Sequence, residues 1–236
     1  MALAIALILA IIPSAVILRY FLRRDEFPEP KRAIAVTFAW GIGSIVPAVI
    51  VALLLIAVLD ATIWDELTNP WARGSTIAFF GAAFPEELFK FAVLYFYCRR
   101  LGDFDEPMDG IVYGVTASLG FATLENVLYV ADGGLGVAIV RAFTAVPGHA
   151  MLGAIMGFYF GLAHFGGERR RLLLWAAYFS PVIFHGLYNT VLISPDEGAA
   201  AGWAGLVFIV MAVEFWYVRR LHGRLRQEQA RQVAPA

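Results

Sequence analysis

Seven apolar segments follow one another along this chain of 236 residues. An α-helix rises ~1.5 Å per residue, so about 20 apolar residues cross the ~30 Å hydrocarbon core of a bilayer. The mean hydropathy of +0.71 excludes an ordinary soluble domain. We predict an all-α, polytopic bundle of transmembrane helices in a cell membrane, with spans over residues 2–22, 34–59, 75–98, 108–131, 137–163, 172–193 and 200–218.

Basic residues occupy alternate loops of this pattern. All but three of the Lys and Arg residues lie within 19–32, 99–100, 169–171 and 219–231. Cytoplasmic loops of membrane proteins are enriched in Lys and Arg, so these four stretches are predicted to share the cytoplasmic side. The N-terminus is then outside and the C-terminus inside the cell.

The segments are predicted to form one membrane domain over residues 1–222, followed by a short polar cytoplasmic tail over 223–236. Small residues in the span 108–131 place it at the centre of the bundle, because they let neighbouring helices approach closely. Pro147 predicts a kink in the fifth span. The single cysteine, Cys98, excludes an internal disulfide and is expected to be a packed, inert thiol.

Ionisable residues interrupt four of the apolar spans. Burying one at mid-bilayer costs at least ~2.5 to 3.5 kcal/mol, so several together must line a cavity, pair with one another or bind an ion. Counting ~1.5 Å per residue from the span ends places Glu86, Glu125, His149 and His185 in the middle or outer half of the membrane. We therefore predict that they share one site. Glu214 and the remaining histidines, His164 and His222, are predicted near the cytoplasmic interface.

An acidic pair marks the third span. Glu86 and Lys90 are one helical turn apart, and Glu87 and Lys90 are three residues apart, so both carboxylates share a face with the lysine. Lys90 can hold one glutamate charged and leave the other to act as a general base on water. The alternative is an ion pair that only locks two helices together.

The two intramembrane histidines are candidates for catalysis or metal binding. His149 follows a Pro-Gly pair, and Asn189 lies one turn after His185 on the same face. Either imidazole can ligate a metal or share a proton with a glutamate, and the Asn189 amide can donate a hydrogen bond to an oxyanion. Catalytic candidates are therefore Glu86, Glu87, His149 and His185.

Glu125 and Asn126 are further candidates. Glu125 with the two histidines would complete a His/His/Glu set for catalytic zinc, although the H-E-x-x-H motif is absent. Alternatively, Glu125 pairs with Arg141, which enters the next span from the same side. Asn126 is considered with Asn189 and Lys90 for contacts to substrate or oxyanion.

These motifs resemble the PrsW family of intramembrane proteases, which is related to the CAAX prenyl endopeptidases and bacteriocin-processing membrane proteins. The resemblance covers about residues 30–220 and rests on the motifs Glu86-Glu87-x-x-Lys90, Asp109-Gly110 to Glu125-Asn126, Phe143-Thr144 to Gly148-His149, and His185-Gly186-x-x-Asn189. It implies a protease of the bacterial cytoplasmic membrane whose double glutamate and histidines are catalytic. It also implies cleavage of a membrane-anchored anti-sigma factor on the extracytoplasmic side.

The sequence thus predicts an intramembrane endopeptidase that depends on a metal or on glutamate. Prenyl-protein cleavage is a less favoured member activity, because the spacing from Phe143 to His149 exceeds the F-x-x-x-H of CAAX endopeptidases. The rival class is a non-enzymatic protein, either a proton-coupled transporter or an assembly factor, that uses the same buried groups. No glycine-rich phosphate loop or basic aromatic face indicates binding of nucleotides or nucleic acids.

Overall fold

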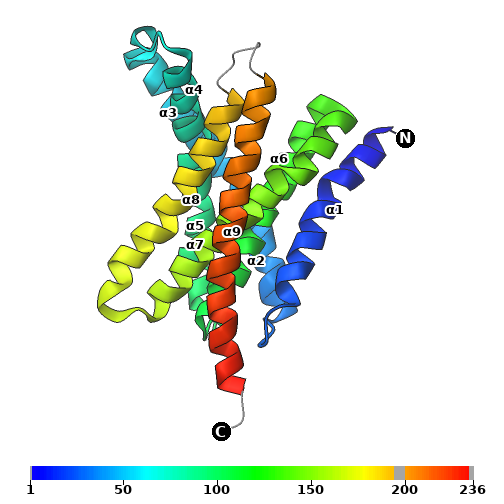
Figure 1. The fold of residues 1–236 in the computed structure, drawn as a ribbon, viewed down its shortest axis with the longest axis vertical. Coiled ribbons are helices and arrows are strands. Elements are labelled where there is room, and N and C mark those ends of the chain that lie inside the picture. Colours follow the sequence, from blue (N-terminus) through cyan, green and yellow to red (C-terminus); the bar gives the residue numbers. More distant parts are fainter. Residues whose placement is uncertain (1, 194–199, 234–236) are drawn as a thin grey trace.

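The described part of the chain is built of helices packed side by side (Figure 1). A computed structural model describes residues 2–193 and 200–233, and within them no strand is present. The all-α prediction is therefore confirmed. The main helices are α1 (Ala2–Leu22), α2 (Lys31–Gly43), α3 (Ile45–Thr62), α4 (Pro70–Ala78), α5 (Phe84–Phe96), α6 (Pro107–Phe143), α7 (Ala145–Phe165), α8 (Arg170–Ile193) and α9 (Ala200–Val233).

Two stretches are long and apolar enough to cross a membrane by their length and composition. They are Lys31–Thr62 and Pro107–Phe165, and Ala10–Leu22 is a shorter apolar helix. Large apolar side chains also cover parts of the outer surface, including Leu53 at 65% and Leu54 at 62% exposure. Such a surface suits lipid rather than water.

The second predicted span, 34–59, is not one continuous helix. The structure divides it into α2 and α3 at Ser44, whose Oγ donates a hydrogen bond to the Gly41 carbonyl at 2.7 Å. Pro47 explains the division, because it has no N–H for the carbonyl of Gly43 and its ring crowds that carbonyl.

The third predicted span, 75–98, contains a wider turn. Helices α4 and α5 are joined without a break by the π-helical turn Phe79–Ala83. Pro85 lies four residues after Gly81 and removes the hydrogen bond that an α-helix would make there. The π-turn accommodates this loss and sets the direction in which α5 presents its acidic pair.

The kink predicted at Pro147 lies earlier in the chain. Helix α6 ends at Phe143, the break falls at Thr144 (φ −121°, ψ −75°), and Pro147 sits in the first turn of α7. Proline is well tolerated there, because the first N–H groups of a helix have no acceptor within it. Inside α6, Gly134 has φ 69°, a conformation that glycine adopts readily.

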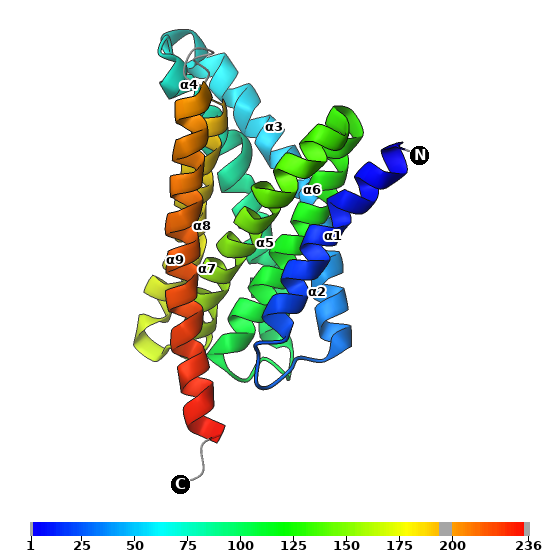
Figure 2. The same ribbon diagram turned by 45° about the vertical axis from the view of Figure 1, so that its right-hand side comes forward.

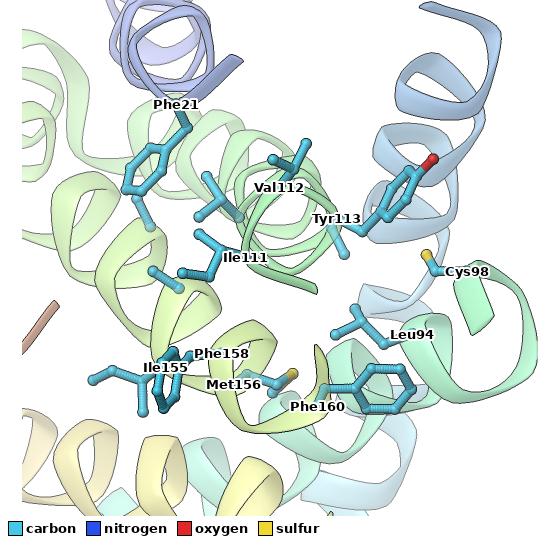
Figure 3. Close-up of a cluster of buried hydrophobic side chains, with 14 of the residues drawn as sticks. Phe21, Leu94, Cys98, Ile111, Val112, Tyr113, Ile155, Met156, Phe158 and Phe160 are labelled. Carbon is cyan, nitrogen blue, oxygen red and sulfur yellow. The ribbon is translucent and has the colours of Figure 1, made fainter. Parts of the chain in front are cut away.

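Helices α6 and α7 form the centre of the molecule. The first half of α6 is buried from Met108 to Thr123, as its small residues predicted. Figure 3 shows large side chains from several helices meeting in the core, among them Phe21, Leu94 and Ile155. The thiol of Cys98 is free and buried at one edge of this cluster, 3.6 Å from the Thr37 hydroxyl.

Helix α9 packs along α7 and α8 on one side of this centre, and α1 packs along α6 on the other (Figure 2). α9 is longer than the predicted span 200–218, because it continues as a helix to Val233. The segment 223–236, predicted as a short polar tail, is therefore helical through Val233. His222, predicted at the interface, is only 8% exposed and packs against Phe21.

Candidate active site

The acidic pair lies in the first turn of α5, directly after the π-turn. Glu87 is fully buried, whereas the Glu86 side chain is 14% exposed. The Lys90 ammonium donates to Glu87 Oε1 at 2.8 Å and reaches Glu86 Oε2 at 3.4 Å. Glu87 therefore takes most of the lysine charge, and Glu86 is the more loosely held carboxylate.

Lys90 has a third partner on α7. Its Nζ lies 3.0 Å from His149 Nδ1 and 4.4 Å from the centre of the Phe121 ring. An ammonium group can only donate, so Nδ1 accepts and the hydrogen of a neutral imidazole is on Nε2. That Nε2–H donates to Glu125 Oε2 at 2.8 Å.

His185 has the opposite arrangement. Its Nδ1 lies 2.8 Å from Glu87 Oε1, and a carboxylate can only accept, so Nδ1 carries the hydrogen. The Nε2 lone pair has no hydrogen-bond partner in the described part of the chain and lies 3.9 Å from Glu86 Oε2. The rings of His185 and His149 meet edge to face, with centroids 5.4 Å apart. One imidazole therefore presents a donor and the other an acceptor.

Glu125 pairs with Arg141, one of the two alternatives that the sequence left open. Arg141 Nη2 donates to Glu125 Oε2 at 2.8 Å, and this oxygen also accepts from His149. Asn126 Oδ1 accepts from Arg141 Nε at 2.8 Å, and its Nδ2 donates to the Ala10 carbonyl at 2.9 Å. Both ends of the Asn126 amide are thus engaged, and this residue ties α6 to α1.

A cavity of about 430 Å³ opens beside these groups. Glu87 and Lys90 lie behind its wall, and Asn126 also does not reach it. The predicted residues that line the cavity are Glu86, Glu125, His149, His185 and Asn189. The structure therefore brings together side chains from four predicted spans, as the depth count implied.

Glu214 also lines this cavity, which is not the position predicted for it from the sequence. It was expected near the cytoplasmic interface, yet it is 1% exposed, and its Oε2 has no hydrogen-bond partner among the described residues. The error came from ending the last span at residue 218, because α9 continues to Val233 and Glu214 lies near its middle. A buried acid within an apolar helix was the available signal.

The donor atoms around the cavity fit a metal ion in part. His185 fits, because Glu87 holds its Nδ1–H and leaves Nε2 free beside Glu86, the arrangement of carboxylate–histidine metal sites. His149 does not fit while Lys90 donates to its Nδ1. The groups whose donor atoms lie within 4.8 Å of one another are Glu86, Glu125 and His149, and Glu86, Glu87 and His185.

The helices and the cavity define a membrane protein that holds carboxylates and imidazoles in a confined polar site, the equipment of a hydrolase acting within the bilayer. Residues 29–218 match the family model described as PrsW family intramembrane metalloprotease, so the chain belongs to the PrsW family. The resemblance noted in the sequence is confirmed, and the protein is a peptidase of bacterial membranes.

Two relatives illustrate the similarity. A protein named Protease PrsW from Geobacillus kaustophilus is 36% identical over 209 residues, which cover 88% of this chain and 86% of that relative. Protease PrsW from Bacillus subtilis is 32% identical over 225 residues, covering 94% and 96% of the two chains. No solved structure matches the chain significantly. An intramembrane peptidase requires a bilayer and a membrane protein as substrate.

Proposed function

We propose that this chain is a seven-span endopeptidase that cleaves a membrane-anchored regulatory protein, such as an anti-sigma factor, on the extracytoplasmic side. Residues 1–222 form the protease domain and 223–236 the tail. The loop charges support an external N-terminus and a cytoplasmic C-terminus. The loops after α1, α5 and α7 lie at the same end of the molecule as the last turns of α9, and the first turns of α1 lie towards the other end (Figure 1).

The observation that carries the proposal is the position of Glu86. It lines the cavity and has only a 3.4 Å contact with Lys90, so its carboxylate is available to a water molecule. Glu86 removes a proton from water as the hydroxide adds to the scissile carbonyl carbon. The carbon–nitrogen bond then breaks, and the proton passes from Glu86 to the leaving amine.

The other polar groups stabilise the charge that develops in this reaction. The Asn189 amide, and the His149 Nε2–H once it turns from Glu125 to the substrate, are donors for the oxyanion of the tetrahedral intermediate. Lys90 keeps Glu87 charged, and Glu87 in turn fixes the orientation of His185. His149 and Asn189 act on the substrate, whereas Lys90, Glu87 and Asn126 are positioning residues.

The family description implies a metal, and we propose zinc. His185 Nε2 and Glu125 would hold it, which leaves Glu86 as the base on water, and His149 would join only after Lys90 releases its Nδ1. When bound, zinc would supply Lewis-acid polarisation and a more acidic water.

Cleavage of a single-span substrate by the purified protein in lipid nanodiscs tests the proposal. Glu86→Gln is expected to lower turnover by at least ~10²-fold, because the base is lost while the side chain keeps its shape. Glu66→Gln, which neutralises an exposed carboxylate on the turn after α3, is the matched control and is expected to cleave normally. Normal turnover by a folded Glu86→Gln protein would contradict the proposal.

A chelator distinguishes a mechanism that requires zinc from one that relies on Glu86 without a metal. Loss of cleavage with a chelator and its recovery with Zn²⁺ would support the zinc assignment. Cleavage that a chelator leaves unchanged would contradict zinc and retain Glu86 as the base. Proton flux in liposomes without peptide cleavage would favour the transporter alternative instead.

A further inference from the structure

A second group of acidic side chains lies far from the cavity, where the loop after α1 meets the start of α6. One oxygen atom each of Asp25, Glu29 and Asp109 lies within 4.8 Å of the others. Asp25 is 8% and Asp109 1% exposed. Asp109 and Glu125 are 16 residues apart on α6, or ~24 Å along the helix, so this group is separate from the candidate active site.

The group has no positively charged partner among the residues that the structure describes. The nearby ion pair joins Arg226 to Glu26 and leaves Asp25, Glu29 and Asp109 out. Their hydrogen bonds come from neutral donors. The backbone N–H groups of residues 105 and 106 donate to Asp109 Oδ2, each at 2.8 Å, and the Tyr113 hydroxyl donates to Glu29. Buried carboxylates without a compensating charge are costly.

A neutral side chain from another helix indicates what kind of partner the three acids lack. Gln229, near the end of α9, is 1% exposed, and its Nε2 donates to Asp25 Oδ1 at 2.9 Å and to Glu106. Its Oε1 is buried and has no hydrogen-bond partner among the described residues, and the same holds for Asp25 Oδ2 and Asp109 Oδ1. Each such atom is destabilising if it stays unpaired.

We propose that this acidic junction, formed by Asp25, Glu29, Asp109 and the Gln229 amide oxygen, binds a hard divalent cation of the Ca²⁺ and Mg²⁺ type. All of its donors are oxygen, which these cations prefer. Two ligands on opposite sides of a Ca²⁺ ion are separated by about 4.6–5.2 Å, and the carboxylate separations fall within this limit. The cation would join the α1–α2 loop, the start of α6 and the end of α9.

Binding of Mn²⁺ to the full chain in nanodiscs, followed by electron paramagnetic resonance, tests this site directly. Asp109→Asn removes a ligand charge, whereas Glu26→Gln removes the neighbouring carboxylate outside the junction. Glu26→Gln is expected to bind Mn²⁺ as the native chain does, with displacement by Ca²⁺ or Mg²⁺, and Asp109→Asn at least ~10-fold more weakly. Asp25→Asn serves as a second ligand variant if Asp109→Asn does not fold.

Equal Mn²⁺ binding by the ligand variants and Glu26→Gln would mean an adventitious ion only and would overturn the proposal. Any ion in the membrane cavity contributes equally to all these proteins and cancels in the comparison. Cleavage is not measured, so this result does not depend on the proposed protease mechanism.

The variant Gln229→Glu distinguishes a bound cation from protons that the acids share among themselves. A bound cation gains a carboxylate ligand, so we expect tighter Mn²⁺ binding and a larger rise in melting temperature on adding Ca²⁺ or Mg²⁺. If the acids only share protons, the same change removes a hydrogen-bond donor and adds another acid. A lower melting temperature that neither cation restores would overturn the proposal.

Discussion

Lys90 connects the polar groups of the candidate active site through one atom. Its Nζ contacts both glutamates of the acidic pair and His149, and the whole side chain is buried. Replacing a buried ion pair by apolar residues is often neutral, but removing one partner alone leaves a buried charge unpaired. Lys90 therefore organises the charges of the site more than it adds to stability.

Lys90→Met is expected to lower the free energy of unfolding by about 3–5 kcal/mol, because Glu87 is fully buried and loses its cation. The double variant Lys90→Met/Glu87→Gln is expected to recover much of this loss. Thermal unfolding in detergent, compared across the single and double variants, measures the effect. A melting temperature for Lys90→Met equal to that of the native chain would refute the role given to Lys90.

His222 predicts a pH dependence of stability. Burial, together with Arg226 and Arg24, lowers the pKa of His222 to about 4 from its ordinary 6.5. Between these pH values the unfolded chain binds a proton that the folded chain excludes, so stability falls as the pH drops from 6.5 towards 4.

His222→Phe should flatten this part of the stability curve, since phenylalanine can keep the edge contact with Phe21 without binding a proton. Melting temperatures of both proteins across this pH range provide the comparison. Acidic groups outside this contact titrate in both proteins and cancel. Parallel curves for the two proteins would rule out this contribution.

At the scale of elements, glycines set the distance between α6 and α7. A Cβ atom on Gly157 would lie 2.0 Å from the Gly110 carbonyl oxygen, and a Cβ atom on Gly114 would lie 2.3 Å from the Gly153 carbonyl oxygen. No side chain fits at this contact, so the backbones themselves touch, as in other small-residue helix interfaces.

Gly157→Ala is expected to destabilise the protein by about 1–3 kcal/mol or more, because the clash is with backbone that cannot move aside. Gly148→Ala in the same helix is the matched control, since a Cβ there meets nothing within 4 Å. Thermal unfolding of the two variants gives the comparison. The prediction fails if both variants melt at the same temperature.

The sequence predicted correctly that the described part of the chain is helical, but it predicted poorly where the helices are interrupted. Span lengths follow from hydropathy, which is a local property, and the central place of α6 followed from its small residues. The breaks at Ser44 and Thr144 each lie three residues before a proline, and the π-turn Phe79–Ala83 ends two residues before Pro85. The sequence argument placed the kink at the proline itself, although the lost hydrogen bond belongs to the residue four positions earlier.

At the scale of the whole molecule, the predicted topology can be tested with the single native cysteine removed. In a Cys98→Ala background, Asp65→Cys on the turn after α3 is expected to react with an impermeant maleimide added to intact cells. Glu168→Cys on the α7–α8 connection should react only after permeabilisation. Both positions are exposed, so accessibility depends on the side of the membrane. The opposite pattern would reverse the proposed orientation.

The helix rise predicted which residues lie at a similar depth, because depth follows from the position of a residue along its span. It did not find which way each side chain turns. Asn126 was grouped with the site but faces α1 and Arg141, whereas Glu214 was left out but faces the cavity. The direction of the two imidazoles also depends on Lys90 and Glu87, contacts that only the assembled bundle creates.

The wide turn at Phe79–Ala83 has a consequence for how such proteins can change over time. Deleting one codon there would let the segment close into a regular α-helix that still crosses the membrane. A π-helical turn distributes about the same rotation over one more residue than an α-helical turn, so Glu86 would keep nearly the same direction. The ring of Pro85 would instead crowd the carbonyl four residues before it. The extra residue of the wide turn and the proline after it are therefore expected to be gained or lost together in the evolution of such proteins.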